Sequence, residues 1–228
     1  MRMLSVGSAL ALTLLASSAV ADPSAPAEAP AVTNAAGPTY ELGVRIGGYG
    51  FRREGDPRPG EGWTECRMNG LGVFGTRTLP GPFFVEAGLD MYSSADVTNP
   101  MDLPIDRTSG LVSGAIGVRT QVASWLRGYV QLGAGMEVTK VSVPYGDQRI
   151  RDTKALPEGF FGVGADLKIW KGTHIGATFR TLVMGSFDYD PSHLDPNGGW
   201  VAAPTAKDVF AATTGVAAQG QFYIRRDL

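Results

Sequence analysis

The chain has 228 residues, a formal net charge of −2 at pH 7 and 43% hydrophobic residues. This near-neutral charge and the absence of any polybasic run give no basis for a nucleic-acid partner. Cys66 is the only cysteine, so an intramolecular disulfide is excluded. We interpret Cys66 as a small, partly buried apolar residue; the alternatives are a reactive thiol and an intermolecular bridge.

The first residues have the pattern of a secretory signal peptide. Arg2 precedes an apolar run over residues 4–15, and small residues then lead to Ala19-Val20-Ala21. This ending predicts cleavage after Ala21, and the run is shorter than the about 20 apolar residues that a membrane-spanning helix needs. We therefore predict that residues 1–21 are a signal peptide. Residues 22–38 are rich in Pro and Ala without periodicity, which predicts a disordered, extended periplasmic lead segment.

Alternation of apolar with polar or small residues dominates the rest of the chain, and it is clearest in residues 208–228. One face of this stretch carries Phe210, Ala212, Thr214, Val216, Ala218, Phe222 and Ile224. Period two is the period of a β-strand, and one apolar face suits a wall with lipid outside and a polar lumen inside. Similar stretches precede this closing strand at residues 39–51, 66–78, 83–92, 110–122, 126–141, 159–169 and 174–184.

The segments between these strands alternate in length. Long polar loops are expected at residues 52–65, 93–109, 142–158 and 185–207, and tight turns at residues 79–82, near Ser124 and at residues 170–173. Short periplasmic turns opposite long extracellular loops are typical of outer membrane barrels, whereas a soluble β-sandwich usually turns about every 8–12 residues. We predict that residues 39–228 form an all-β, eight-stranded antiparallel up-and-down transmembrane β-barrel, with a soluble β-protein as the alternative.

Aromatic residues lie near the expected ends of the strands. The periplasmic ends carry Tyr40, Phe83, Trp125, Trp170 and Phe222, and the extracellular ends carry Tyr49, Phe51, Tyr92, Phe160, Phe161 and Phe187. Outer membrane barrels place aromatic girdles at both membrane interfaces. We therefore predict that these residues form two girdles.

The polar faces of the strands place charges of both signs inside the barrel. The predicted lumen carries Glu41, Arg45, Glu86, Asp90, Arg119, Arg127, Glu137, Asp166, Lys168, Arg180 and Arg225. An eight-stranded barrel is just wide enough for its own side chains, and charges in such an interior need partners. We predict a charge-paired core. The alternative is a narrow pore gated by exchange among the pairs.

Evidence for catalytic or metal chemistry is weak in this sequence. His174 follows an expected periplasmic turn, and His193 lies next to Ser192 in a loop, where adjacent residues rarely face each other. The same loop offers Asp188, Asp190, Ser192 and Asp195 as calcium ligands, but His193 stands where an EF-hand requires glycine. We predict no catalytic, cofactor-binding or metal-binding residues, and no cofactor.

The architecture resembles the small eight-stranded outer membrane proteins, namely the OmpA-type transmembrane domain and the opacity-like barrels. The resemblance covers residues 39–228 and includes an apolar-aromatic closing strand, Phe222-Tyr223-Ile224, before the terminal Leu228. It implies an outer membrane location in a Gram-negative bacterium and recognition by the barrel-insertion machinery. Together with the weak evidence for catalysis, it predicts a non-enzymatic protein that is structural or weakly pore-forming.

The external partners are expected to be the lipids around the barrel and whatever binds the loops. Basic residues in the first and third long loops are candidates for contacts with lipopolysaccharide phosphates. They are Arg52, Arg53, Arg58, Arg149, Arg151 and Lys154. The ligand of the loops is not specified by the sequence. A lipid A-modifying outer membrane enzyme and a surface adhesin are the alternative functions.

Overall fold

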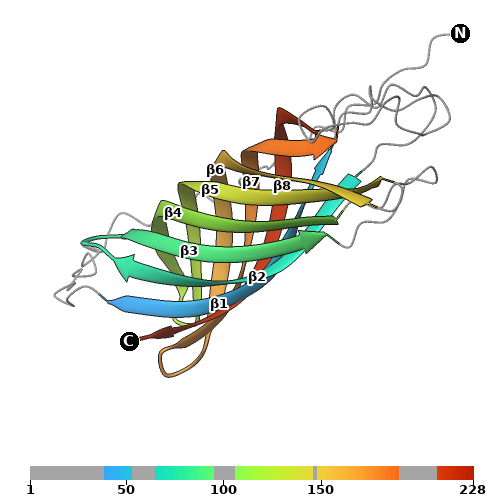
Figure 1. Ribbon diagram of the computed structural model, residues 1–228. Coiled ribbons are helices and arrows are strands. Elements are labelled where there is room, and N and C mark those ends of the chain that lie inside the picture. Colours follow the sequence, from blue (N-terminus) through green and yellow to red (C-terminus); the bar gives the residue numbers. More distant parts are fainter. Residues whose placement is uncertain (1–38, 53–64, 95–105, 146–147, 190–209) are drawn as a thin grey trace, which may run out of the picture. The chain divides into compact units, whose positions relative to one another are not determined.

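Eight antiparallel strands follow one another around a closed ring (Figure 1). The computed structural model describes residues 39–52, 65–94, 106–145, 148–189 and 210–228. In these ranges no helix is long and apolar enough to cross a membrane. The strands are β1 (Tyr40–Arg52), β2 (Glu65–Thr78), β3 (Phe83–Ser94), β4 (Asp106–Ala123), β5 (Leu126–Tyr145), β6 (Gln148–Trp170), β7 (Thr173–Tyr189) and β8 (Phe210–Asp227). The predicted eight-stranded barrel is confirmed.

The register of the strands sets the width of the barrel. A path that starts at Glu41 and crosses every strand from partner to partner returns to β1 at Phe51, ten residues further along. With a spacing of about 4.8 Å between strands and a rise of about 3.4 Å per residue, this stagger gives a strand tilt of about 40° and a backbone radius of roughly 8 Å. Such an interior holds side chains and little else.

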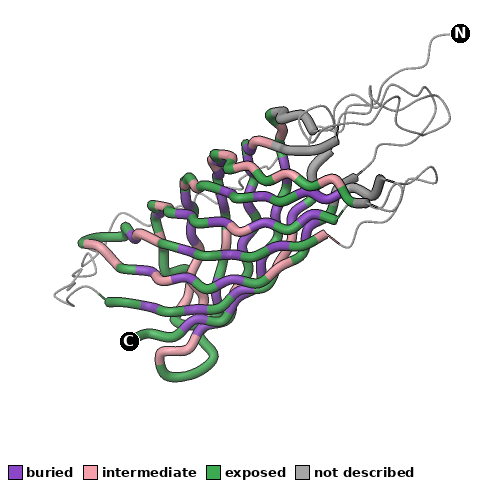
Figure 2. The backbone as a smooth tube through the Cα atoms, in the orientation of Figure 1, coloured by how far each residue is buried: buried purple, intermediate pink, exposed green. Residues whose placement is uncertain are grey.

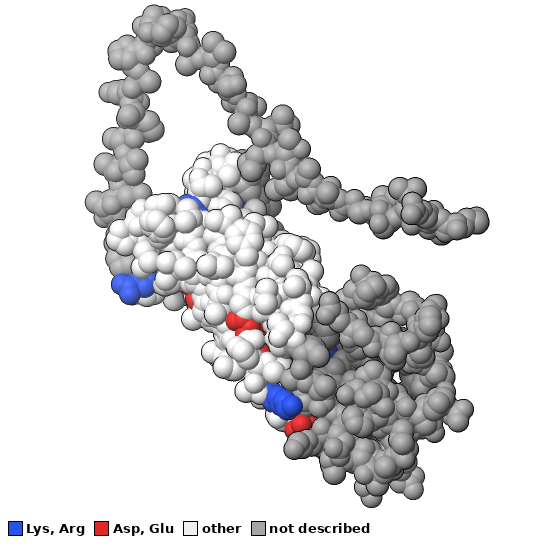
Figure 3. Space-filling view, turned by 90° about the horizontal axis from the view of Figure 1, so that it is seen from above, with Lys and Arg blue, Asp and Glu red and all other residues white. Residues whose placement is uncertain are grey.

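Side chains alternate between the two faces of the wall over most of each strand. In β1, Arg45 is 4% exposed and its neighbour Ile46 is 64% exposed. Figure 2 shows the same alternation of buried and exposed residues along every strand, and the described surface in Figure 3 is mostly uncharged. Large apolar side chains that face outward contact lipid rather than water in a membrane barrel. The period of two in the sequence therefore predicted the faces of the strands correctly.

Tight turns close the periplasmic end of the barrel. Gly81 and Gly172 have φ angles of 77° and 69°, a backbone conformation that glycine adopts without steric penalty. Both lie in turns predicted from the sequence. The amide of Asp227 donates a hydrogen bond of 2.7 Å to the carbonyl of Gly172, which fastens the end of β8 to the β6–β7 turn.

One expected loop is instead mostly strand. Residues 142–158 were predicted to form the third long loop, but β5 continues to Tyr145 and β6 begins at Gln148, so the two strands form a long hairpin. Above the lipid both faces of a ladder can meet water, so the apolar alternation that marks a membrane strand is lost there. Pro157, a turn signal in the sequence, lies just before the β6–β7 ladder begins at Glu158 and is accommodated in β6.

The periplasmic aromatic girdle agrees with the prediction, whereas much of the extracellular one does not. Tyr40, Phe83, Trp125, Trp170 and Phe222 are all exposed on the wall or its rim. Tyr49, Tyr92 and Phe160 instead point into the barrel, because each occupies an inward position of the alternation; Phe161 alone is exposed among those whose side chains are described. The side chains of Phe51 and Phe187 lie outside the described part.

Candidate functional site

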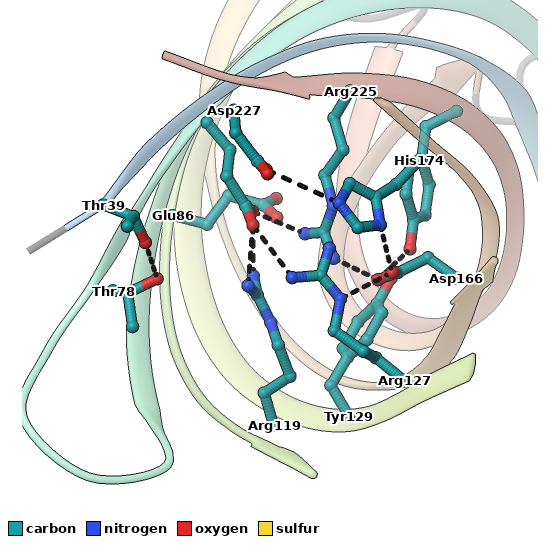
Figure 4. A network of polar contacts seen from close by, with 12 residues as sticks. Thr39, Thr78, Glu86, Arg119, Arg127, Tyr129, Asp166, His174, Arg225 and Asp227 are labelled. Atoms are coloured by element: carbon teal, nitrogen blue, oxygen red, sulfur yellow. Dashed lines mark hydrogen bonds and ion pairs between the residues drawn. The ribbon is translucent and has the colours of Figure 1, made fainter. Parts of the chain in front are cut away.

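The inner wall near the periplasmic end carries a cluster of five charged side chains, which we call the periplasmic cluster. It consists of Glu41, Arg119, Arg127, Asp166 and Arg225. Arg119 donates two hydrogen bonds to Glu41, of 2.9 and 3.0 Å. Arg127 bridges the two carboxylates, at 3.2 Å from Glu41 and 2.8 Å from Asp166. Figure 4 labels four of these side chains, Arg119, Arg127, Asp166 and Arg225, which converge inside the ring.

Arg225 completes the periplasmic cluster from the last strand. Its guanidinium lies 3.1 Å from Glu41 and forms a second ion pair with Asp166. The members come from β1, β4, β5, β6 and β8, so the cluster joins strands that are not neighbours in the ladder. Each buried carboxylate meets at least two guanidinium groups, which satisfies the requirement that buried charges be paired and hydrogen-bonded.

His174 lies at the periplasmic edge of this cluster. Its Nδ1 is 3.4 Å from Asp166 Oδ1, and its Nε2 is 3.5 Å from Asp227 Oδ1 (Figure 4). The imidazole is buried, whereas Asp227 reaches solvent. The position agrees with the predicted periplasmic placement of His174 and lies far along the strand from the extracellular rim.

A second group of charged side chains, which we call the central cluster, lies on the extracellular side of the periplasmic cluster. Arg45 donates to Asp90 through Nε at 2.6 Å and through Nη2 at 2.5 Å, and to Glu86 through Nη1 at 2.8 Å. Arg180, 1% exposed, donates to the same Glu86 oxygen at 2.9 Å. With its amide oxygen turned toward Arg180, Gln131 also accepts at 2.9 and 3.0 Å. Two cations and two carboxylates thus balance across the lumen.

Aromatic rings separate the charged groups. Phe74 packs edge-on against Tyr223 and Phe84 against Tyr129, with ring centroids 5.6 and 5.8 Å apart. The guanidinium of Arg119 lies 4.8 Å from the centroid of the Phe84 ring, close enough for a cation–π interaction. The sequence analysis did not single out these rings, although Phe84 is two residues from Glu86 and therefore shares its face.

The extracellular half of the lumen holds a buried apolar and aromatic cluster. It comprises Tyr49, Met68, Tyr92, Leu111, Phe160, Leu182, Met184 and Ala217. Tyr49 donates a hydrogen bond of 3.0 Å to Glu137, and Gln219 donates one of 2.9 Å to Tyr92. Buried polar side chains, among them Arg107, Ser109 and Thr139, share this half with the cluster.

Glu158 is a buried acid that sequence reasoning missed. It was expected at the end of a loop, but it lies on β6 at 6% exposure and faces the lumen. Its Oε1 makes no hydrogen bond to any described residue. Glu158 is on the same face as Phe160, so correct assignment of the strand boundary would have revealed it.

The structure brings nine of the eleven predicted lumen charges together in the two clusters, and Glu137 and Lys168 lie outside them. Glu137 lies on the inner wall beside Tyr49, whereas Lys168 is exposed at the periplasmic rim, where its backbone pairs with His174 at the last regular position of the β6–β7 ladder. The prediction that Lys168 belongs to the lumen network is therefore wrong. Lys168 keeps the inward register, but at the rim its side chain is exposed and joins no ion pair among the described residues.

The structure places the candidate contacts to lipopolysaccharide in different environments. Arg149 hydrogen-bonds Ser142 at 2.9 Å and pairs with Asp106, Arg151 is exposed, and Lys154 is half-buried on the opposite face of β6. Arg52 ends β1 with its side chain outside the description. Arg53 and Arg58 lie outside the described residues, as do Asp190, Ser192, His193 and Asp195; Asp188 lies in β7 with its side chain outside the description.

The described part of the chain holds no group of three or more His, Cys, Asp or Glu side chains arranged for a metal ion. Cys66 lies in β2, and its side chain is not described. The chemistry of the inner wall is thus that of ion pairs, hydrogen bonds and aromatic packing.

Comparison with solved structures supports the fold. The chain is similar to Neisserial surface protein A, with 10% identity, a TM-score of 0.54, and coverage of 84% of this chain and 99% of that one. It is also similar to a major outer membrane protein from Thermus thermophilus, with 9% identity, a TM-score of 0.52, and coverage of 85% and 100%. A third similar structure is Ail, the attachment invasion locus protein of Yersinia pestis, with 17% identity, a TM-score of 0.41, and coverage of 81% and 97%.

Comparison with curated protein sequences gives no match. The family model described as the outer membrane protein beta-barrel domain matches residues 8–203, which is most of the chain. The chain therefore belongs to the outer membrane protein β-barrel domain family and is a protein of the outer membrane.

Proposed function

We propose that the protein is a non-enzymatic structural barrel that does not conduct ions and that presents its extracellular segments from the outer membrane. The observation that carries this proposal is the cross-lumen pairing of the periplasmic cluster and the central cluster. Both are anchored on opposite walls of a lumen about as wide as its own side chains.

The clusters act in series along any path through the barrel. An ion that crosses must displace charge-assisted hydrogen bonds, each of which contributes roughly 1.5–3 kcal/mol, at two successive levels. Between the charges, the Phe84–Tyr129 and Phe74–Tyr223 pairs fill the lumen with rings that offer an ion no replacement for its hydration. A closed core is therefore favoured over an open channel.

One observation supports a weakly conducting, gated barrel as a second candidate. The Oε1 atom of Glu86 accepts from both Arg45 and Arg180, and Gln131 offers Arg180 another acceptor. A shared carboxylate permits exchange of partners, and such an exchange would displace Arg45 from the middle of the lumen.

Single-channel conductance of the refolded barrel in a planar bilayer separates the two candidates. We expect no discrete conductance from the wild type and the appearance of small steps in Arg45→Ala and Arg180→Ala, because each substitution removes a guanidinium from the central cluster. Arg77→Ala is the matched control, since Arg77 is exposed and lies over the Tyr40 ring on the outer wall. Reproducible steps from correctly inserted wild type would overturn the closed-core proposal.

The alternative of a lipid A-modifying enzyme is tested separately. A deletion strain complemented with wild type or with His193→Ala should give identical lipid A masses if the barrel is non-enzymatic. A mass change restored only by the wild type would establish catalysis. For an adhesin, trimming residues 53–64, 95–105 and 190–209 would abolish surface binding while the barrel still folds.

A further inference from the structure

The extracellular extension of β4, β5 and β6 carries an exposed polar strip on its outward face. The strip consists of Thr108, Lys140, Thr153 and Arg151, and we call it the rim strip. Register places Thr108, Lys140 and Thr153 side by side across the three strands. Arg151 is paired with Ser142, two residues beyond Lys140, and is thus its diagonal neighbour. All four side chains are exposed.

The rim strip begins where the lipid-facing surface ends. Met136 and Val138 share the outward face of β5 with Lys140 and are 47% and 49% exposed. Two residues of strand cover about 6.8 Å, so Lys140 follows Val138, the preceding apolar residue on the outward face, by roughly the depth of a lipid headgroup. A cation at this level faces the phosphates of the surrounding leaflet.

Among the described residues, the two cations of the strip have no competing side-chain partner. No ion pair or hydrogen bond joins the side chain of Lys140 or Arg151 to another side chain in the described part of the barrel. Their neighbour Arg149 is different, since Ser142 and Asp106 hold it against the hairpin. Arg149 is thus paired within the protein, whereas Lys140 and Arg151 are available to an external ligand.

We propose that the rim strip binds the phosphate groups of an anionic lipid of the outer leaflet, namely the phosphorylated headgroup of lipopolysaccharide. Lysine supplies a point charge and arginine a planar donor pair for phosphate oxygens, and the hydroxyls of Thr108 and Thr153 flank Lys140 on both sides. A lipid-borne phosphate is favoured over a soluble anion because the strip continues the surface that contacts acyl chains, so one molecule can engage both.

The structure revises the set of candidates derived from the sequence. Lys140 enters the site although it was placed in a strand and not in a loop. Arg151 remains a candidate contact. Arg149 is excluded because it is paired with Asp106, and Lys154 is excluded because it is half-buried on the other face of β6.

Titration of lipid onto the refolded protein in neutral detergent micelles tests the proposal, with bound lipid counted by native mass spectrometry. The probes are bisphosphorylated lipid A, the same lipid without phosphates, and inorganic phosphate. At about 1 kcal/mol for each cation near a membrane surface, Lys140→Gln/Arg151→Gln should weaken binding of bisphosphorylated lipid A about 30-fold. The control Arg77→Gln/Arg226→Gln removes two exposed cations at the periplasmic end and should leave the affinity unchanged.

Each alternative gives a different result. Equal binding of the lipid without phosphates, or equal affinity in the Lys140→Gln/Arg151→Gln variant and wild type, would overturn the proposal. Equal loss in the control pair would mean non-specific attraction and would also overturn it. Binding of inorganic phosphate as tightly as lipid A would refute the lipid assignment. Because both double variants change exposed side chains, an unchanged far-UV spectrum confirms that each barrel is folded.

Discussion

Replacing Arg45 by methionine tests whether the lumen is a paired electrostatic core. Arg45 makes three short hydrogen bonds, two to Asp90 and one to Glu86. In Arg45→Met, Glu86 keeps Arg180, whereas Asp90, which is 3% exposed, loses every hydrogen-bonding side chain among the described residues. Removing one partner of a buried ion pair costs about 3–5 kcal/mol, so we expect the free energy of unfolding to fall by that amount.

The double variant Arg45→Met/Asp90→Asn isolates the cause. It removes the stranded charge along with its partner, and an amide is far less costly to bury than an isolated carboxylate. We expect it to recover roughly 2–3 kcal/mol relative to Arg45→Met. Urea unfolding of the barrel in phosphatidylcholine vesicles, followed by tryptophan fluorescence, measures both variants. A single-variant loss below about 1 kcal/mol, the value typical of a solvent-exposed pair, would refute the reasoning, as would equal stability of the two variants.

The same unfolding assay tests three further predictions with five substitutions. Gly117→Ala should lower the free energy of unfolding by about 1–3 kcal/mol, because its new methyl would lie 2.4 Å from a carbon of an inward aromatic ring. The control is Gly114→Ala on the outward face of the same strand. Its nearest contact would lie at 3.9 Å, so the free energy of unfolding should change little. Glu158→Met should raise stability by about 1 kcal/mol, since it removes a buried carboxylate oxygen without a hydrogen-bond partner. Glu137→Met should lower the stability, because Glu137 accepts a hydrogen bond from the Tyr49 hydroxyl. Equal effects of Glu158→Met and Glu137→Met would contradict the conclusion that only Glu158 has an oxygen without a partner. Lys168→Ala should stay within about 0.5 kcal/mol of wild type, and a larger loss would return Lys168 to the lumen network.

The sequence predicts most of the barrel because lipid imposes a pattern on every residue that crosses it. Where a strand has lipid on one face and the lumen on the other, the sequence shows which residues face inward. An example is the inward Arg45 beside the outward Ile46. The same logic failed at residues 142–158, where outward residues such as Arg151 and Thr153 are polar and the apolar alternation is lost. It also failed at Lys168, which keeps the inward register but lies at the rim, where its side chain is exposed.

Membership of the lumen network was predictable, but its pairing was not. Parity along a strand indicates that Glu41 and Arg225 point inward, yet only the stagger of the ring decides which charges lie at one level. Glu41 meets Arg119, Arg127 and Arg225 because the ten-residue stagger brings β4, β5 and β8 to the level of the start of β1. That stagger belongs to the closed ring and to no single strand.

The pairing of Glu41 on the first strand with Arg225 on the last has a consequence for assembly. These residues are nearly a whole chain apart, and their ion pair forms only when β8 meets β1. Until the seam closes, Glu41 and Arg225 lack each other, so an open sheet carries charges that membrane lipid would exclude. Closure of the ring therefore also neutralises these charges. An incomplete barrel keeps them unpaired, which disfavours it in the membrane.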